Sequence, residues 1–159
     1  VVTLSPDGID LAIRYGGGHW PGLSAEMLLS SPMVVVAAPS LVGEGNLPSI
    51  EDLTDFPWLE EFGTSEANRW LAQHGIKRKF GRGLPQVPGN LLLDGARDGQ
   101  GVAVTVRTFV ERDIAAGRLR VLEVEDRPEM GYHIVTRPGA MRPVLKDFVR
   151  WIKREGVAA

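Results

Sequence analysis

Residues 9–23 read IDLAIRYGGGHWPGL, a short apolar run that stops abruptly at three successive glycines. Leu11, Ala12 and Ile13 are typical of a strand covered on both faces, and glycine lets the backbone turn where a Cβ atom would clash. Arg14 and Tyr15 then lie at the carboxyl end of this strand. Ligands of open α/β sheets bind outside such ends, so both residues are candidate ligand contacts. The alternative is that Arg14 serves a structural ion pair.

Length and composition indicate a globular chain. Its 159 residues, 43% of them hydrophobic, are enough to bury a core in one domain or in two small lobes. No stretch approaches the roughly 18 apolar residues of a membrane span, and the first residues lack the pattern of a secretory signal. The chain has no cysteine, which excludes disulfides and thiolate chemistry and is compatible with a reducing compartment. We expect a cytoplasmic protein that does not meet a membrane.

Charge and motifs exclude several function classes. Eighteen basic and 20 acidic residues give a net charge of −2, which argues against this segment gripping DNA itself. Neither glycine cluster, residues 16–18 or 81–83, fits a phosphate-binding motif, and there is no nucleophile elbow. The three histidines are far apart, so we expect no metal. Glu60 and Glu61 should point to opposite faces of a strand, one solvated and one ion-paired. No catalytic set and no cofactor are expected.

Apolar runs and turn residues predict alternating strands and helices, an α/β chain with a mainly parallel sheet. A capping box at residues 49–52 opens a short helical turn that Pro57 ends. Helices are expected from Thr64 or Ser65 to Gly75, from Asn90 as the cap to about Gly99, over residues 108–116, and from Pro143 to the end. Strands are expected at residues 33–38, 58–62, 101–105, 119–124 and 132–136, and a loop with a short edge strand at residues 77–88.

Two helices carry a clear apolar face. The first presents Ala67, Trp70 and Leu71, and the closing helix has a longer apolar stripe at helical spacing. We expect the aromatic residues of that stripe to belong to the core. Its members are Val144, Leu145, Phe148, Val149, Trp151 and Ile152.

Several pieces of the chain together resemble one known family, the effector-sensing domain of LysR-type transcriptional regulators. Within it, the chain is most similar to the branch of the glycine-cleavage activator and the β-lactamase regulator. The resemblance extends over residues 1–154. The pieces that carry it are residues 10–16 (DLAIRYG), 20–23 (WPGL), 25–26, 38–40, Ala96 with 99–103 (GQGVA), and 116–119 (AGRL).

This resemblance implies a fold of two α/β lobes, like the type 2 periplasmic solute-binding proteins, with an effector in the cleft between them. The first lobe would comprise residues 1–28 and 129–159, and the second residues 29–128. The hinge crossings would fall near residues 26–31 and 126–131.

The chain departs from the family pattern in two ways. The family's helix-turn-helix domain, linker helix and first strand, helix and strand of the sensor do not match any part of it, so the first lobe should be incomplete. Residues 1–5 have strand propensity but align with the tail of a short helix. We therefore expect the chain not to fold autonomously, since Phe148 and Trp151 would lack cover. The second departure is Thr105-Val106-Arg107, where many members carry proline.

The leading hypothesis is a sensor domain of a bacterial transcription factor, and not an enzyme. A solute-binding protein of a transporter shares the fold but should carry a secretion signal. An enzyme on the same scaffold would need an acid/base pair, for which His19 and Glu60 are the candidates. The motif match favours the regulator, and a helix-turn-helix before Val1 would exclude the other two.

We expect the effector to be small and anionic, since Asn90 begins a helix with free N–H groups and Arg14 or Arg107 can pair with an anion. For the two tyrosines the alternative is a role as core aromatics. The resemblance further implies a homodimer or homotetramer that binds DNA through a helix-turn-helix outside this segment. The expected effector contacts are Arg14, Tyr15 and Gly16 from the first lobe, Thr64, Asn90, Thr105 and Arg107 from the second, and Tyr132 near the hinge.

Overall fold

The computed structural model describes residue 4, residues 8–76 and residues 85–158 of the chain. The chain divides into two compact units. Unit 1 comprises Val1–Pro32 and Asp126–Ala159, and unit 2 comprises Met33–Glu125. The helix tail expected at residues 1–5 and most of the loop expected at residues 77–88 lie outside the described residues. The hinge positions given above remain a prediction.

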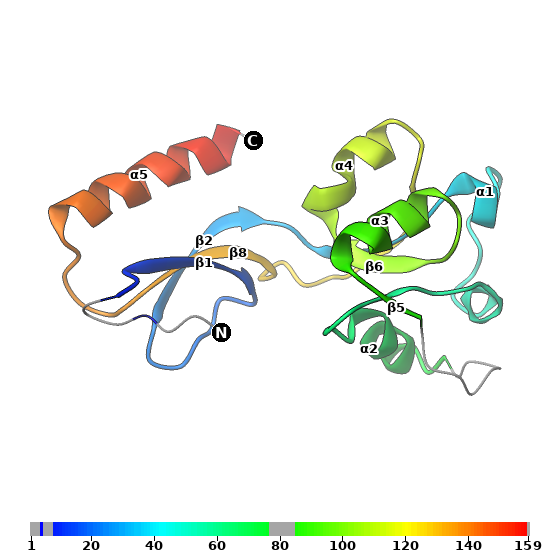
Figure 1. Ribbon diagram of the computed structural model, residues 1–159, viewed down its shortest axis with the longest axis horizontal. Helices are drawn as coiled ribbons and strands as arrows, with labels where there is room; N and C mark the ends of the chain where they lie inside the picture. Colours follow the sequence, from blue (N-terminus) through cyan, green and yellow to red (C-terminus); the bar gives the residue numbers. More distant parts are fainter. Residues whose placement is uncertain (1–3, 5–7, 77–84, 159) are drawn as a thin grey trace. The chain divides into compact units, whose positions relative to one another are not determined.

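Unit 1 is built on a three-stranded sheet with one helix beside it (Figure 1). Its strands are β1 (Leu11–Gly16), β2 (Ser24–Ser30) and β8 (Gly131–Thr136), in the order β1-β8-β2. Helix α5 (Pro143–Ala158) packs against this sheet through β2, where Gly156 lies against Leu28. The sheet therefore has β1 at one edge.

Unit 2 holds the remaining elements. Figure 1 shows α3 and α4 on one side of β6 and α2 on the other. Its strands are β3 (Met33–Ala37), β4 (Glu60–Glu61), β5 (Gln86–Val87), β6 (Ala103–Val106) and β7 (Arg120–Val124). Its helices are α1 (Pro39–Val42), the 3₁₀ turn η1 (Asp52–Asp55), α2 (Glu66–Gln73), α3 (Gly89–Arg97) and α4 (Arg107–Ala115).

We expected mainly parallel sheets, but neighbouring strands in both three-stranded sheets are antiparallel. β8 is antiparallel to both β1 and β2, and β3 is antiparallel to both β6 and β7. Parallel pairing joins β4 to β5 and, through one bridge, Trp58 to Val102. The central strand of each three-stranded sheet is the first strand after a crossing between units, so it runs opposite to its neighbours. The two outer strands of each sheet therefore run in the same direction, β1 with β2 and β6 with β7, and this part of the expectation is correct.

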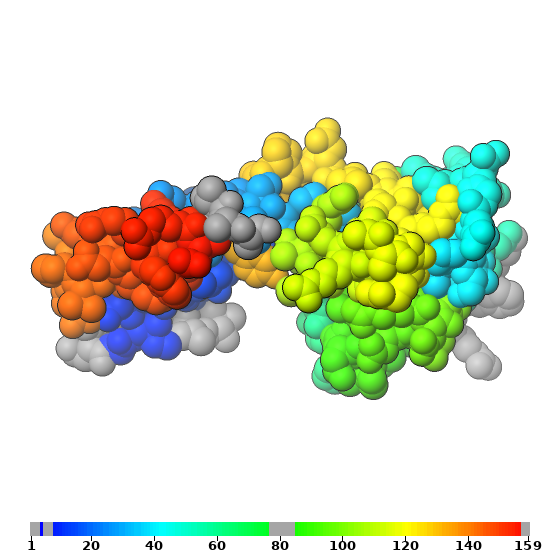
Figure 2. Space-filling view, turned by 90° about the horizontal axis from the view of Figure 1, so that it is seen from above, coloured from blue at the N-terminus to red at the C-terminus, as the bar shows by residue number. Residues whose placement is uncertain are grey.

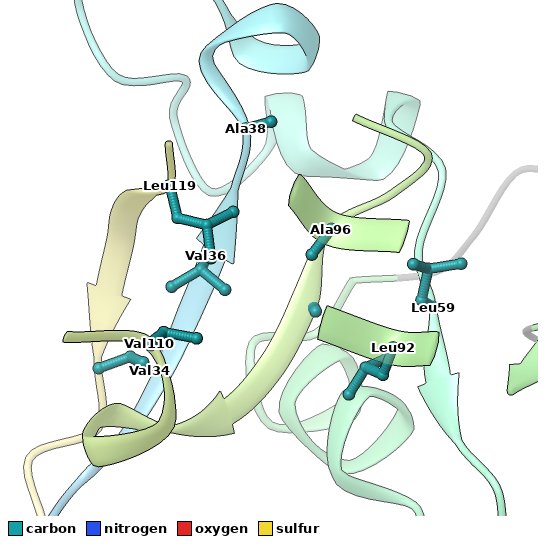
Figure 3. Close-up of a cluster of buried hydrophobic side chains, with 9 residues drawn as sticks. Val34, Val36, Ala38, Leu59, Leu92, Ala96, Val110 and Leu119 are labelled. Atoms are coloured by element: carbon teal, nitrogen blue, oxygen red, sulfur yellow. The ribbon is translucent and has the colours of Figure 1, made fainter. Parts of the chain in front are cut away.

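The core of unit 2 forms around β3, whose five residues are all buried. Figure 3 shows Val34 and Val36 of β3 beside Val110 and Leu119, with Ala96 and Leu92 of α3 facing them. On the opposite side of the sheet, the indole of Trp58 stacks on Trp70 of α2 at 5.3 Å. The continuous apolar run of residues 33–38 thus becomes a strand covered on both faces, as the sequence predicts.

Unit 1 is covered less well than the sequence predicts. Ile13 is 46% exposed, which contradicts the expectation that its strand is buried on both faces. On α5, Val149 is buried, but Phe148 and Trp151 are 42% and 47% exposed and therefore are not core residues. In Figure 2, α5 (orange to red) lies at the surface and faces the viewer. The reason is geometric, because β1 is an edge strand and α5 packs on one sheet only.

The capping box and the buried face of the first predicted helix are confirmed. Ser49 and Asp52 form the expected capping box, since Asp52 N–H donates to Ser49 Oγ at 3.2 Å and Ser49 N–H donates to Asp52 Oδ2 at 3.0 Å. Helix α2 buries Ala67, Trp70 and Leu71, and its chain turns away at Gly75 with a φ of +67°.

Candidate functional site

The predicted ligand contacts of unit 1 gather at one end of its sheet. Tyr15 pairs with Tyr132 across β1 and β8, and their rings meet edge to face at 5.3 Å. Arg14 and Gly16 are the neighbouring positions of the same strand end. The Tyr15 hydroxyl donates to the carbonyl of Ser31 at 2.9 Å, which ties β1 to the end of β2. Burial raises the pKa of the Tyr132 phenol.

The glycine turn after β1 is held against β8 by aromatic contacts. Trp20 meets the imidazole of His133 edge to face at 5.4 Å, and a Cβ atom on Gly16 would lie 3.1 Å from the Trp20 ring. Gly18 has a φ of +81°, and a Cβ atom there would lie 2.9 Å from Nε2 of His133. Because both the backbone angle and the space require glycine, this turn fixes the position of the strand end that carries Arg14 and Tyr15.

The predicted contacts of unit 2 also share one sheet edge. Thr64 follows β4, Asn90 follows β5, and Thr105 stands in the second half of β6 with Arg107 directly after it. β4 and β5 are parallel, and the Trp58–Val102 bridge gives β6 the same direction. The carboxyl ends of these three strands therefore lie at the same edge, the place where open α/β sheets bind ligands.

Asn90 does not cap α3 as predicted. The helix begins at Gly89, Pro88 is its cap residue, and no side chain caps it among the described contacts. Asn90 is the second residue of the first turn, since the extended backbone of Pro88 already directs the chain into the helix. Its side chain is exposed in the first turn of α3.

Arg107 is the first residue of α4 and lies 3.5 Å from Glu111, one turn further along. A cation at the positive end of a helix dipole is electrostatically unfavourable, because helix amino ends prefer acidic residues. The Glu111 carboxylate partly offsets this charge.

The sequence did not predict that Glu60 is buried and caps α2. Glu60 is 1% exposed, and it makes no ion pair among the described residues, contrary to the expectation for the Glu60–Glu61 pair. Its carboxylate accepts hydrogen bonds from the N–H groups of Ala67 at 3.1 Å and Asn68 at 3.0 Å and from the Asn68 side chain at 2.8 Å. The Thr64 hydroxyl lies 3.3 Å away. The start of α2 is thus filled by the protein's own carboxylate.

Glu61 points the other way, as alternation along a strand requires. It is exposed, and its Oε1 lies so close to Gly89 that a Cβ atom there would approach to 2.5 Å. The two glutamates of β4 therefore face the first turns of two successive helices on opposite sides of the sheet.

No described cluster of histidine, aspartate or glutamate could hold a metal ion. Within the described residues, no helix combines the length and apolar composition that a bilayer span needs. Of the two enzyme candidates named above, Glu60 accepts hydrogen bonds from the Ala67 and Asn68 N–H groups at the start of α2. His19 lies in unit 1 and Glu60 in unit 2.

Two α/β units, each with its candidate contacts at strand ends, define the two-lobed class of binding domains related to periplasmic solute-binding proteins. Residues 3–156 match the LysR substrate binding domain family, and the chain belongs to it. The expected family and its two-lobed α/β fold are thereby confirmed, apart from the strand pairing corrected above.

Two curated relatives that match the chain are named as transcriptional activators. It is 31% identical over 155 residues to the AhcY transcriptional activator HvrB of Rhodobacter capsulatus, covering 98% of this chain and 53% of that protein. It is 33% identical over 115 residues to the glycine cleavage system transcriptional activator of Escherichia coli K12, covering 71% of this chain and 38% of that protein. The expected branch is therefore correct. The chain spans about half the length, or less, of these relatives.

A solved structure shares the fold. The effector domain of the transcriptional regulator AmpR of Pseudomonas aeruginosa aligns with a TM-score of 0.69 at 23% identity, covering 99% of this chain and 76% of that one.

Proposed function

We propose that this chain is the effector-sensing part of a LysR-type transcriptional regulator. The observation that carries the proposal is the family match over residues 3–156, because the whole two-unit fold is included in it. The relatives named above are transcriptional activators, which favours a regulator over the alternatives of a transport protein or an enzyme. In this proposal the regulator binds DNA through a part outside these residues, works as a homodimer or homotetramer in the cytoplasm, and catalyses no reaction.

The effector is bound by the two strand-end edges described above. From unit 1 it contacts Arg14, Tyr15 and Gly16 together with Tyr132, and from unit 2 Thr64, Asn90, Thr105 and Arg107. Support comes from the position of these residues at the carboxyl ends of strands or at the helix starts that follow, apart from Tyr132, which lies at the amino end of β8 opposite Tyr15. Binding can shift the regulator between two states only if the effector prefers one of them.

The effector is a small anion. Arg14 and Arg107 provide guanidinium groups, and the amino end of α3 provides N–H groups. The start of α2 is not available to the effector, because Glu60 occupies it. Because the Glu61 carboxylate lies against Gly89 at the start of α3, Arg107 at the start of α4 is expected to be the main partner of an acidic effector in unit 2.

The test is a thermal-shift screen of the full-length regulator with small carboxylates, amino acids, neutral sugars and amines at constant ionic strength. We expect stabilisation by a carboxylate or another oxyanion, weakened in both Arg14→Ala and Arg107→Ala. An exposed arginine on α5, Arg150, gives the control variant Arg150→Ala, which should leave the shift unchanged. Stabilisation by neutral or cationic compounds alone would contradict the proposed effector class.

A further inference from the structure

A second polar pocket lies in unit 1, apart from the proposed effector contacts. It has a volume of about 160 Å³ and is formed where the chain leaves β8 and enters α5. Asp10, Thr136, Arg137, Arg142 and Leu145 are among the residues that line it. Its size suits a small oxyanion and is below the range of pockets for drug-sized ligands.

Positive charge exceeds negative charge in this pocket. Nη2 of Arg142 donates a hydrogen bond to Oδ2 of Asp10, while Nη2 of Arg137 stands 3.8 Å from the other carboxylate oxygen. The second distance is too long for a hydrogen bond. Two guanidinium groups thus share one carboxylate, and the cluster keeps a net charge of +1.

One donor atom of Arg137, its Nε, lacks a hydrogen-bond partner among the described residues. This atom is also buried. Buried donors are almost always paired, because leaving one unpaired loses its hydration without replacement. Arginine presents its N–H groups as a planar fork that fits two oxygens of a carboxylate or phosphate at once.

We propose that this pocket binds a small oxyanion, a carboxylate or phosphate, between Arg137 and Arg142. The ligand accepts from the terminal nitrogens of Arg137, and it competes with Asp10 for Arg142. Asp10 is therefore an internal competitor, which makes the expected affinity sensitive to its charge. None of these residues is among the proposed effector contacts, so the two proposals stand or fall separately.

The test follows the arginine Nε–H resonances of the full-length protein by NMR while sodium phosphate is added at constant ionic strength. We expect a saturable shift of the Arg137 signal. Arg150 on α5 pairs with Asp147 and is exposed, and its signal should shift only weakly and linearly. Arg137→Gln should weaken phosphate binding by about tenfold or more, whereas Arg150→Gln should leave it unchanged.

Asp10→Asn is the most discriminating variant. Removal of the competing carboxylate should tighten phosphate binding by about threefold or more. Should Arg137→Gln disturb the amide spectrum, Arg137→Lys keeps the charge but removes the fork and should still weaken binding. Equal shifts at Arg137 and Arg150, or weaker binding in Asp10→Asn, would overturn the proposal. So would the absence of a saturable shift at Arg137.

Discussion

The carboxylate of Asp113 on α4 accepts a hydrogen bond of 2.9 Å from Nη2 of Arg97 at the end of α3. Asp113 is only 4% exposed at its side chain, and Arg118 donates to its other oxygen at 2.7 Å. Arg97 also pairs with Asp94, which is 60% exposed. One buried acid thus joins α3, α4 and the segment that leads into β7.

Replacing Asp113 should destabilise unit 2 much more than replacing Asp94. Asp113→Asn leaves two guanidinium groups without their buried partner, and we expect a loss of about 2 kcal/mol in the free energy of unfolding, because both arginines are partly solvated. Asp94→Asn should change it by less than about 1 kcal/mol. Urea unfolding at pH 7, followed by circular dichroism, measures both values. Equal losses would show that burial of Asp113 contributes nothing.

The stability should also depend on pH through Asp113. The hydrogen bond from Arg97 lowers the pKa of Asp113 below its ordinary value of 3.8. A lowered folded-state pKa adds stability that is complete above the unfolded value and is lost as pH falls through the folded value. We therefore expect the difference in unfolding free energy between the parent chain and Asp113→Asn to be constant above pH 5 and to shrink below about pH 4. A difference that grows on acidification would contradict this assignment.

Glu60 should be essential to the start of α2, although its neighbour Glu61 is not. In Glu60→Gln one oxygen becomes an amide donor that faces the N–H groups of Ala67 and Asn68, and we expect a loss of about 2 kcal/mol. Glu61→Gln is the matched control, with an expected change within about 0.5 kcal/mol. Hydrogen exchange at the Ala67 and Asn68 amides should accelerate in Glu60→Gln alone. Unchanged exchange there would mean that the helix start does not depend on the carboxylate.

The exposed face of α5 should tolerate charge where its buried face does not. Trp151→Lys should change the unfolding free energy by less than about 0.5 kcal/mol and should reduce concentration-dependent association of the chain. Val149→Lys, two residues away and buried, should destabilise unit 1 by about 3 kcal/mol or more. Urea unfolding and analytical ultracentrifugation separate the two effects. A large loss of stability in Trp151→Lys would show that this face is covered in solution.

Variants at the proposed effector contacts of unit 2 should weaken effector binding without lowering the stability of the fold. Once a ligand is identified, Asn90→Ala and Thr105→Val should each weaken its binding by about tenfold, which corresponds to one lost hydrogen bond of about 1.4 kcal/mol. Calorimetric titration of the full-length regulator measures this effect. The control is Asn68→Ala, which removes an amide bound to Glu60 and should lower stability while leaving affinity within about twofold. Unaltered affinity in both site variants would refute their assignment.

Much of the fold was predictable because its signals are local. The capping box of Ser49 and Asp52 and the apolar face of α2 each depend on residues a few positions apart, so the sequence carries the full information. The buried strand β3 follows in the same way from an uninterrupted apolar run. The family resemblance added the two-lobed architecture, which no periodicity could have supplied.

The remaining features depend on which segments meet in space. Nothing in the Glu60–Glu61 pair indicates which acid is buried, because that depends on the side of the sheet where α2 packs. The partner of Asp113 stands 16 residues earlier on another helix. The antiparallel central strands and the uncovered face of α5 likewise follow from chain crossings and sheet edges. Local periodicity determines which face of an element is apolar, but long-range packing determines whether anything covers it.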